Sequence, residues 1–376
     1  MVTKQFIYDT LLNEEDLCNL AREKKLLLDG IAQKKKMIVY GIRNCGKTSL
    51  VKNVVIPHFQ KKHKEAFVLF VDFMDAKSLE SLRTRVQHGF EKAFVKCFPG
   101  KSFLQKVKDF LSSLRPQIEF DPATGQPSLT INAEKSATPL SLMDLFDVIK
   151  KNIAPKMPVL IVFDEFQDIA FIPEAQGLFR QVIQELKEIP VVFLGSKKHI
   201  LSDLFAKPRA PLANTGEDLE FLPIPYEEYH DYILERLKPK KIKLDLELSK
   251  KLQDRLHRIP EPINIVCAHI QDHFETRTLT DADIQKAIND VVEGRSSRYQ
   301  EYLSNFSEKE EELLVALAKQ GFVLQPNGSN FLNGLKISQR SVSLMIKKFL
   351  DKSIVEKTPL GFRLSDPLLT HFLKTN

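Results

Sequence analysis

Residues 41–48 read GIRNCGKT, between an apolar run at residues 37–40 and a helical pattern at residues 49–55. The stretch satisfies the pattern GxxxxGK followed by Ser or Thr, in which a glycine-rich loop turns its backbone N–H groups inward around an anion. The helix after such a loop presents its positive end to phosphate. We therefore predict a nucleotide-phosphate site. Its residues are Gly41, Arg43, Asn44, Cys45, Gly46, Lys47, Thr48 and Ser49.

An acidic pair follows a second apolar run. Residues 159–163 are apolar at every position, which is typical of a strand covered on both faces, and Asp164 and Glu165 come directly after it. Because ligands of open α/β sheets bind at the carboxyl ends of strands, we expect this pair to face the phosphate loop. Asp164 is predicted to hold Mg2+ with the Thr48 hydroxyl, and Glu165 to activate the attacking water. Lys47 is expected to reach the β- and γ-phosphates of ATP.

Two further residues near this site have alternative interpretations. Ser196 follows the apolar run 191–194 and Gly195, at a strand tip where it could sense the γ-phosphate or the water, or could cap a helix that starts near residue 198. Cys45 is either a reactive thiol that ATP protects, because it lies beside a helix N-terminus, or a small residue at a variable loop position.

Five short apolar runs alternate with helical patterns. They cover residues 37–40, 66–73, 159–164, 191–196 and 219–224. This alternation predicts an α/β fold, a P-loop NTPase domain with a parallel five-stranded sheet and crossover helices. Residues 117–120 and 128–132 flank the turn-rich sequence DPATG, which predicts a β-hairpin insertion near 117–132, either functional or ornamental.

The strands stop near residue 226, and the pattern becomes helical. Apolar residues at 342, 345, 346, 349 and 350 predict a late helix, and short runs at 354–357 and 362–364 flank a turn. Helices followed by such a hairpin make a winged helix. We predict a P-loop ATPase domain at 1–225, a helical lid at 226–300 and a winged-helix domain at 301–376.

Composition excludes several classes of protein. The apolar content is 43%, but no run approaches the roughly 18 apolar residues of a membrane span. Residues 1–17 lack the apolar core of a signal peptide, and the four cysteines lie far apart without metal-ligand spacing. We expect a cytoplasmic protein with reduced thiols and no membrane partner. The net charge of +6 is mild, so charge alone does not indicate nucleic acid.

Several stretches together resemble the STAND and archaeal-type ATPases, which are related to AAA+ proteins and replication-initiator ATPases. They are Arg22-Glu23 with Leu26, GIRNCGKTSL, VLIVFDEFQDI, VVFLGS, and SDPLL at 365–369. The resemblance covers nearly the whole chain. It implies the sheet order 5-1-4-3-2, a helical lid, a C-terminal winged helix, and an adenine pocket lined by residues around Arg22.

The sequence departs from this family's pattern at two places. Family members often read Arg-Arg-x-Gly-Lys in the phosphate loop, whereas Asn44 and Cys45 follow Arg43 here. The lid usually offers Gly-x-Pro near the nucleotide, and here residues 258–262 read RIPEP, in which Pro262 is the favoured opener of a helix at 263–270. Arg209 lies where AAA+ relatives carry an arginine finger, but an exposed loop arginine is the competing interpretation.

Three functions compete at this point. The first is an ATP-hydrolysing conformational switch in signalling or defence, with a protein partner or a homo-oligomer in the nucleotide-bound state. The second is a DNA-associated ATPase of the initiator or transposition-helper kind, whose winged helix reads duplex DNA. The third is a small-molecule kinase, against which the large C-terminal half and the Asp164–Glu165 pair argue.

Overall fold

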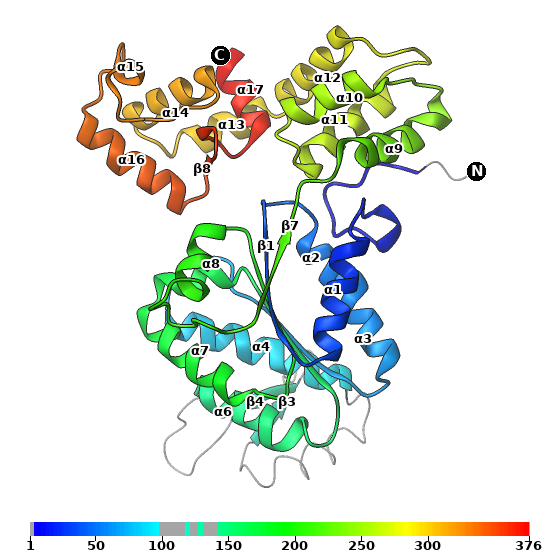
Figure 1. Cartoon of the computed structure of the whole chain (residues 1–376), viewed down its shortest axis with the longest axis vertical. Helices are drawn as coiled ribbons and strands as arrows, with labels where there is room; N and C mark the ends of the chain where they lie inside the picture. Colours follow the sequence, from blue (N-terminus) through cyan, green and yellow to red (C-terminus); the bar gives the residue numbers. More distant parts are fainter. Residues whose placement is uncertain (1–3, 98–116, 121–126, 131–140, 376) are drawn as a thin grey trace. The chain divides into compact units, whose positions relative to one another are not determined.

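A computed structural model describes residues 4–97, 117–120, 127–130 and 141–375 of the chain (Figure 1). The chain divides into two compact units. Leu11–Leu222 form the first, and Pro223–Asn376 together with Met1–Thr10 form the second. None of the described helices is both long enough and apolar enough to span a bilayer.

A five-stranded parallel sheet forms the centre of the first unit. Its strands lie in the order β2-β5-β6-β1-β7, which confirms the order 5-1-4-3-2 when they are numbered along the chain. Their bounds are β1 Lys36–Gly41, β2 Phe67–Asp72, β5 Val159–Asp164, β6 Val191–Gly195 and β7 Glu217–Phe221.

Helices cover both faces of this sheet. The alternation of side chains along β1 sends Ile38 to one face and Met37 and Val39 to the other, and each face has its own apolar core. One core is closed by α4, α6, α7 and α8, and the other by α1 and by the helix of α2, η2 and α3 (Figure 1). The helical bounds are η1 Glu14–Asp16, α1 Ala21–Ala32, α2 Lys47–Leu50, η2 Val51–Val55, α3 Ile56–Lys62, α4 Leu79–Cys97, α6 Leu142–Val148, η3 Ile149–Ile153, η4 Phe166–Phe171, α7 Pro173–Glu185 and α8 Lys198–Phe205.

The fifth strand lies at the sheet edge and starts earlier than its apolar residues indicate. Leu219 and Phe221 are buried, while Glu217 and Asp218 are exposed. An edge strand alternates in this way because only one of its faces is covered. The prediction of 219–224 followed the apolar residues and therefore lay too far along the chain.

A separate two-stranded antiparallel sheet joins β3 (Gln117–Phe120) and β4 (Pro127–Thr130). The bounds of β3 are those predicted for the inserted hairpin, 117–120. The second strand was predicted at 128–132, and β4 begins one residue earlier and ends two residues earlier. The predicted turn at 121–125 and the residues beyond 130 lie outside the described residues.

The second unit is mainly helical. Its last part has the helices and the two-stranded hairpin of a winged helix, in which β8 pairs antiparallel with β9. The bounds are α9 Tyr226–Leu237, η5 Lys238–Lys240, α10 Leu246–Arg255, α11 Pro260–His273, α12 Asp281–Glu293, α13 Ser296–Leu303, α14 Glu308–Gln320, α15 Ser329–Leu332, α16 Gln339–Asp351, β8 Val355–Thr358, β9 Gly361–Leu364 and α17 Pro367–Thr375.

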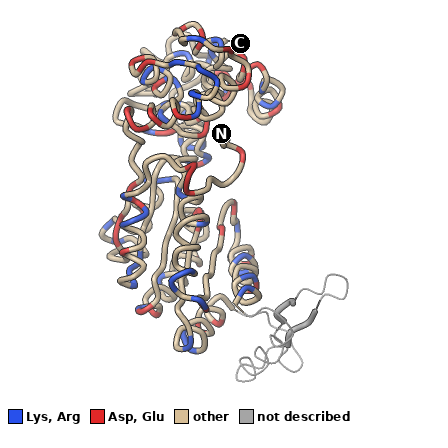
Figure 2. The backbone as a smooth tube through the Cα atoms, turned by 90° about the vertical axis from the view of Figure 1, so that its right-hand side faces the viewer, with Lys and Arg blue, Asp and Glu red and all other residues tan. Residues whose placement is uncertain are grey.

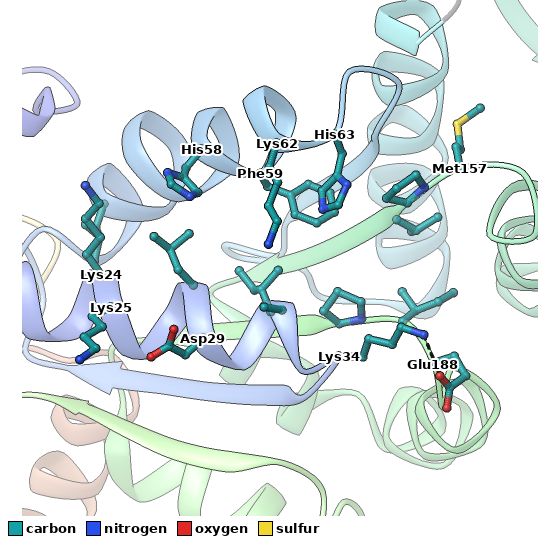
Figure 3. Close-up of a pocket in the computed structure, with 18 of the residues that line it drawn as sticks. Lys24, Lys25, Asp29, Lys34, His58, Phe59, Lys62, His63, Met157 and Glu188 are labelled. Carbon is teal, nitrogen blue, oxygen red and sulfur yellow. Dashed lines mark hydrogen bonds and ion pairs between the residues drawn. The ribbon is translucent and has the colours of Figure 1, made fainter.

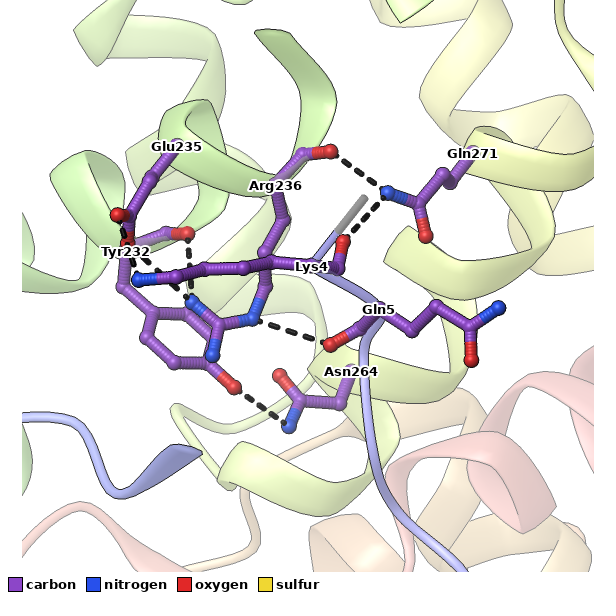
Figure 4. A network of polar contacts seen from close by, with 7 residues as sticks. All are labelled: Lys4, Gln5, Tyr232, Glu235, Arg236, Asn264 and Gln271. Carbon is purple, nitrogen blue, oxygen red and sulfur yellow. Dashed lines mark hydrogen bonds and ion pairs between the residues drawn. The ribbon is translucent and has the colours of Figure 1, made fainter. Parts of the chain in front are cut away.

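The N-terminal segment belongs to this second unit, whereas the sequence analysis assigned it to the ATPase domain. Phe6 is 4% exposed and packs edge-on against Tyr232, with ring centroids 6.2 Å apart. The fully buried Arg236 stacks on Tyr232 at 3.5 Å and donates from Nε to the Gln5 carbonyl at 3.2 Å (Figure 4).

Backbone carbonyls of the same segment also accept hydrogen bonds from two side chains of α11. Gln271 Nε2 donates to the Lys4 carbonyl at 3.1 Å and also to the Arg236 carbonyl at 2.6 Å. Asn264 Nδ2 donates to the Ile7 carbonyl at 3.0 Å. Buried amide and guanidinium donors need partners, and this segment supplies them, which explains why it packs here rather than on the sheet.

Candidate functional site

The phosphate loop leaves β1 and enters α2 through two left-handed residues. Asn44 has φ of 60° and Gly46 has φ of 90°, so the backbone turns its N–H groups inward as an anion-binding nest requires. Gly41 is needed for space, because a Cβ there would lie 2.7 Å from Phe221 Cβ on the neighbouring strand. Cys45 is half-buried, and all four cysteines are free thiols.

Lys47 is the first residue of α2 and is 6% exposed. Its Nζ donates to the carbonyls of Gly41 at 3.1 Å and Ile42 at 2.8 Å, and lies 3.5 Å from Cys45 Sγ. Within the described part of the chain, no carboxylate lies within ion-pair distance of this ammonium. A buried cation beside the positive end of a helix attracts an anion, so the local electrostatics favour phosphate.

Thr48 and Asp164 meet at the carboxyl ends of the strands. The Thr48 hydroxyl donates to Asp164 Oδ2 at 2.9 Å. An alcohol and a carboxylate are the hard oxygen donors that Mg2+ accepts while it keeps water and phosphate oxygens as its other ligands. The residues present therefore fit a magnesium ion held by Thr48 and Asp164, as the sequence analysis proposed.

Asp164 is 4% exposed, and burial raises its pKa to about 6. The hydrogen bond from Thr48 opposes that shift, while the nearby charges of Glu165 and Asp72 add to it. Asp72 ends β2 directly opposite Asp164 in the sheet register. A buried carboxylate surrounded by like charges is an environment that a divalent cation would relieve.

Glu165 follows Asp164 in a left-handed conformation, with φ of 49°. Its carboxylate Oε2 accepts a hydrogen bond from Ser196 Oγ at 3.1 Å and another from Gln167 Nε2. Lys197 rather than Ser196 is the N-cap residue of α8, and it makes no side-chain cap. The Ser196 hydroxyl thus contacts the predicted water-activating residue and does not cap the helix.

The segment before α1 contacts the helix that follows the phosphate loop. Leu12 N donates to Ser49 Oγ at 3.2 Å, and Asn53 Nδ2 donates to the Leu12 carbonyl at 2.9 Å. Arg22 has a side chain that is 61% exposed and pairs with Glu23 at 3.1 Å. Its role in an adenine pocket remains a prediction.

Three other predicted residues make none of these contacts. Arg43 is exposed within the loop, and Arg209 is exposed between α8 and β7. Pro262 is buried inside α11 of the second unit. The helix begins at Pro260 rather than after Pro262, because a proline suits the first helical position, where no N–H is required.

Two residues of the site were missed by the sequence analysis. Gln167 is 1% exposed and joins Glu165 to the tip of β6, and Asp72 adds a carboxylate beside Asp164. The predicted sheet order places β2 next to β5, so Asp72 could have been found as the last residue of that strand. Nothing local marks Gln167.

A cavity of about 1200 Å³ lies elsewhere in the first unit, between α1 and α3 (Figure 3). Leu28, Phe59, Met157 and Pro190 contribute to its walls. No residue of the loop 41–48 lines it, and it reaches the beginnings of β5 and β6 rather than their carboxyl ends. It is therefore separate from the phosphate loop.

Comparisons with known proteins agree with this architecture. Residues 297–375 match the family model described as "Probable winged helix domain". None of the curated proteins matches the chain. The fold is similar to that of a Walker-type ATPase of Pyrococcus abyssi, with 16% identity, a TM-score of 0.63, and coverage of 98% of this chain and 99% of that one.

Two structures from Aeropyrum pernix are also similar. The Orc1 protein, solved in complex with DNA, has 15% identity and a TM-score of 0.53 over 99% of this chain and 95% of its own. The Orc2 protein, in ADPNP and ADP complexes, has 13% identity and a TM-score of 0.53 over 98% and 96%. The chain therefore has a P-loop ATPase fold followed by a winged helix. These similarities do not single out the STAND group, which remains a prediction.

Proposed function

We propose that this chain binds ATP with Mg2+ and hydrolyses it slowly, so that the nucleotide state switches its conformation. The observation that carries the proposal is the buried Lys47 ammonium beside the Thr48–Asp164 pair. This ammonium donates to loop carbonyls and, among the residues that the structure describes, pairs with no carboxylate. A buried cation, a nest of N–H groups and a magnesium-type ligand pair are together the parts that nucleotide triphosphate binding needs.

The residues have separate roles in this proposal. Lys47 and the loop N–H groups bind the phosphates, and Thr48 and Asp164 hold the metal, which neutralises phosphate charge when bound. Glu165 Oε2 is engaged by Ser196 and Gln167, which leaves Oε1 to accept a hydrogen bond from the attacking water. A carboxylate that orients water suits hydrolysis better than transfer to an alcohol, so the kinase alternative is less favoured.

The winged helix has two candidate roles. We favour a contact with protein, either with the rest of the chain or with a partner. Leu344 on α16 is 63% exposed and Leu360 at the hairpin turn is 64% exposed. An apolar side chain gains free energy when a protein surface covers it, whereas it offers no interaction to a phosphate. Lys348, one of the basic residues of α16, is paired with Glu310.

Duplex DNA is the second candidate partner. The winged-helix match and the similarity in fold to a protein solved with DNA support it. Arg340 and Lys347 are exposed on α16 and could meet phosphates. However, residues 301–374 carry ten Lys and Arg against eight Asp and Glu, and Figure 2 shows both signs interspersed along the second unit. Duplex-binding domains usually have a clustered basic face.

Phosphate release from ATP tests the enzymatic part. Wild type should turn over ATP in the presence of Mg2+, and Glu165→Gln should bind ATP equally well while hydrolysing it at least about 100-fold more slowly, the usual scale for a lost general base. Glu174→Gln, on α7, makes the same chemical change at an exposed position and should leave turnover unchanged. Equal turnover by wild type and Glu165→Gln would refute the assignment of Glu165.

A duplex titration separates the two roles of the winged helix. If the module contacts protein, intact protein should bind duplex only weakly at physiological salt, and Leu344→Ser should change the ATPase rate or the ATP-dependent mass in light scattering. Sub-micromolar duplex affinity that Arg340→Ala and Lys347→Ala abolish, but Lys319→Ala does not, would favour the DNA reader. That affinity should also fall steeply between about 50 and 200 mM salt.

A further inference from the structure

Gln167 lies between the water-activating residue and the tip of the next strand. Its Nε2 donates to Glu165 Oε2 and lies 3.4 Å from Asp168 Oδ1, and its Oε1 accepts from Ser196 N at 3.3 Å. Ser196 Oγ in turn donates to the same Glu165 oxygen at 3.1 Å. Three residues thus form a closed set of hydrogen bonds that joins the end of β5 to the end of β6.

The orientation of the carboxamide is determined by its neighbours. A backbone N–H can only donate, so the amide oxygen of Gln167 faces Ser196 N, and the amide nitrogen is left to face Glu165. Gly195 leaves room for the carboxamide, because a Cβ at that position would lie only 2.4 Å from Gln167 Oε1. Gln167 is only 1% exposed, so bulk solvent has little access to its carboxamide.

We propose that Gln167 is a positioning residue for ATP hydrolysis, an inference that rests on the proposed function. Its carboxamide holds one carboxylate oxygen of Glu165 against Ser196, so that the other oxygen points to the attacking water. Glu165 alone would not keep that position, since a glutamate side chain has three rotatable bonds and several staggered rotamers available to it. The polar atoms of Gln167 are directed to Glu165, Asp168 and Ser196, so its proposed effect on hydrolysis is exerted through Glu165.

Gln167→Met tests the proposal, because it keeps an unbranched chain of similar length and removes both polar atoms. The single-turnover rate of ATP hydrolysis should fall about 100-fold, the scale expected when a reacting group is misplaced by about 1 Å. The Kd for ATP, measured by calorimetry, should not change, since the phosphates bind to Lys47 and the loop. Gln176→Met is the matched control. Gln176 lies on α7 and donates to the Ala170 carbonyl at 2.9 Å, away from Glu165.

A second comparison shows whether Gln167 acts through Glu165. Adding Gln167→Met to Glu165→Gln should cause no further fall in rate, because the group that Gln167 positions is already lost. A residue with only a structural role would lower the rate again in the double variant. A further fall, or a wild-type rate in Gln167→Met alone, would overturn the proposal.

A stability measurement without nucleotide tests the contact independently and applies even if Gln167→Met does not fold. Gln167→Glu sets two carboxylates against each other, and adding Glu165→Gln restores a donor and an acceptor in exchanged positions. The exchanged variant should therefore melt at a higher temperature than Gln167→Glu. Equal melting temperatures would refute the contact. The hydrolysis assays separate this inference from the proposed function. If hydrolysis falls in the Glu165 variant but not in the Gln167 variant, only the role of Gln167 is refuted. If hydrolysis is unchanged in both the Lys47 and the Glu165 variants, the proposed function is refuted as well.

Discussion

Replacing Lys47 by Met tests the phosphate site most directly, because the structure allows its effect to be estimated with and without nucleotide. Without nucleotide, the Lys47 ammonium is buried against neutral acceptors, the carbonyls of Gly41 and Ile42. Among the described residues this charge has no carboxylate partner, and removing such a buried charge relieves a desolvation cost. The free variant should therefore melt at the same temperature as wild type or higher.

With nucleotide bound, Lys47→Met should lower the stability of the protein relative to wild type. The variant leaves phosphate charge without its buried cation, and breaking such a pair costs about 3–5 kcal/mol. At about 1.4 kcal/mol for each factor of ten, affinity for ATP should fall by about 100- to 4,000-fold. In wild type, ATP at about 100 times its Kd contributes about 2.7 kcal/mol of stability, and this should raise the melting temperature by about 5–11 °C.

Thermal melting with and without MgATP, supported by calorimetry, measures both effects on the same samples. Lys47→Met should lose the rise that ATP causes. Lys52→Met is the matched control, since Lys52 lies in the same continuous helix and places its ammonium 4.2 Å from the Phe70 ring. An ATP-induced rise that is equal in wild type and Lys47→Met would refute the site. So would equal losses in both variants, because they would show a general effect of lysine removal.

Three further predictions concern the same unit. Asp164→Asn should raise the Mg2+ concentration needed for half-maximal hydrolysis by at least about tenfold, measured by titrating Mg2+ at fixed ATP. Maleimide should label Cys45 before Cys97, because burial raises the pKa of Cys97 to about 11, and ATP should protect Cys45; peptide mapping that finds Cys45 unlabelled would contradict this. If Arg209 acts in a neighbouring subunit, Arg209→Ala should lower turnover at unchanged ATP affinity, and mixing it with Lys47→Ala protein should restore some activity. A rate independent of protein concentration and no rescue would leave Arg209 as a surface residue.

The parts of the site that could be predicted depend on local sequence. The loop 41–48 and the pair Asp164–Glu165 each lie within a few residues of a strand end, so their position follows from the strand itself. The Thr48–Asp164 contact also followed, since both residues were expected at the same edge of the sheet.

The parts that were missed depend on distant partners. The segment at residues 4–10 packs in the second unit because Arg236 and Gln271 need acceptors and Phe6 needs an apolar neighbour. The sequence of residues 4–10 does not indicate these partners. The segment is bonded through its backbone carbonyls, which every residue has, so the contacts impose no pattern on its side chains. The start of α11 was missed for a simpler reason, because Pro260 and Pro262 both suit a first helical turn.

The sheet order explains why the predicted phosphate, metal and water-activating residues lie together at the carboxyl ends of the strands. In the order β5-β6-β1, β6 lies between the strand that ends in Asp164 and the strand that leads into the loop. The end of β6 therefore lies beside both the predicted metal ligands and the predicted base, and Ser196 is placed to contact either. The predicted order was sufficient to bring Ser196 near Glu165. The sheet order could not show that Gln167 completes the hydrogen bonds between Glu165 and Ser196. That contact depends on the turn of the chain at Glu165, where φ is 49° and after which Gln167 accepts from Ser196 N. A non-glycine residue costs free energy in that conformation, so the hydrogen bonds of Gln167 and Ser196 help to hold the turn, and the turn places Gln167 to make them.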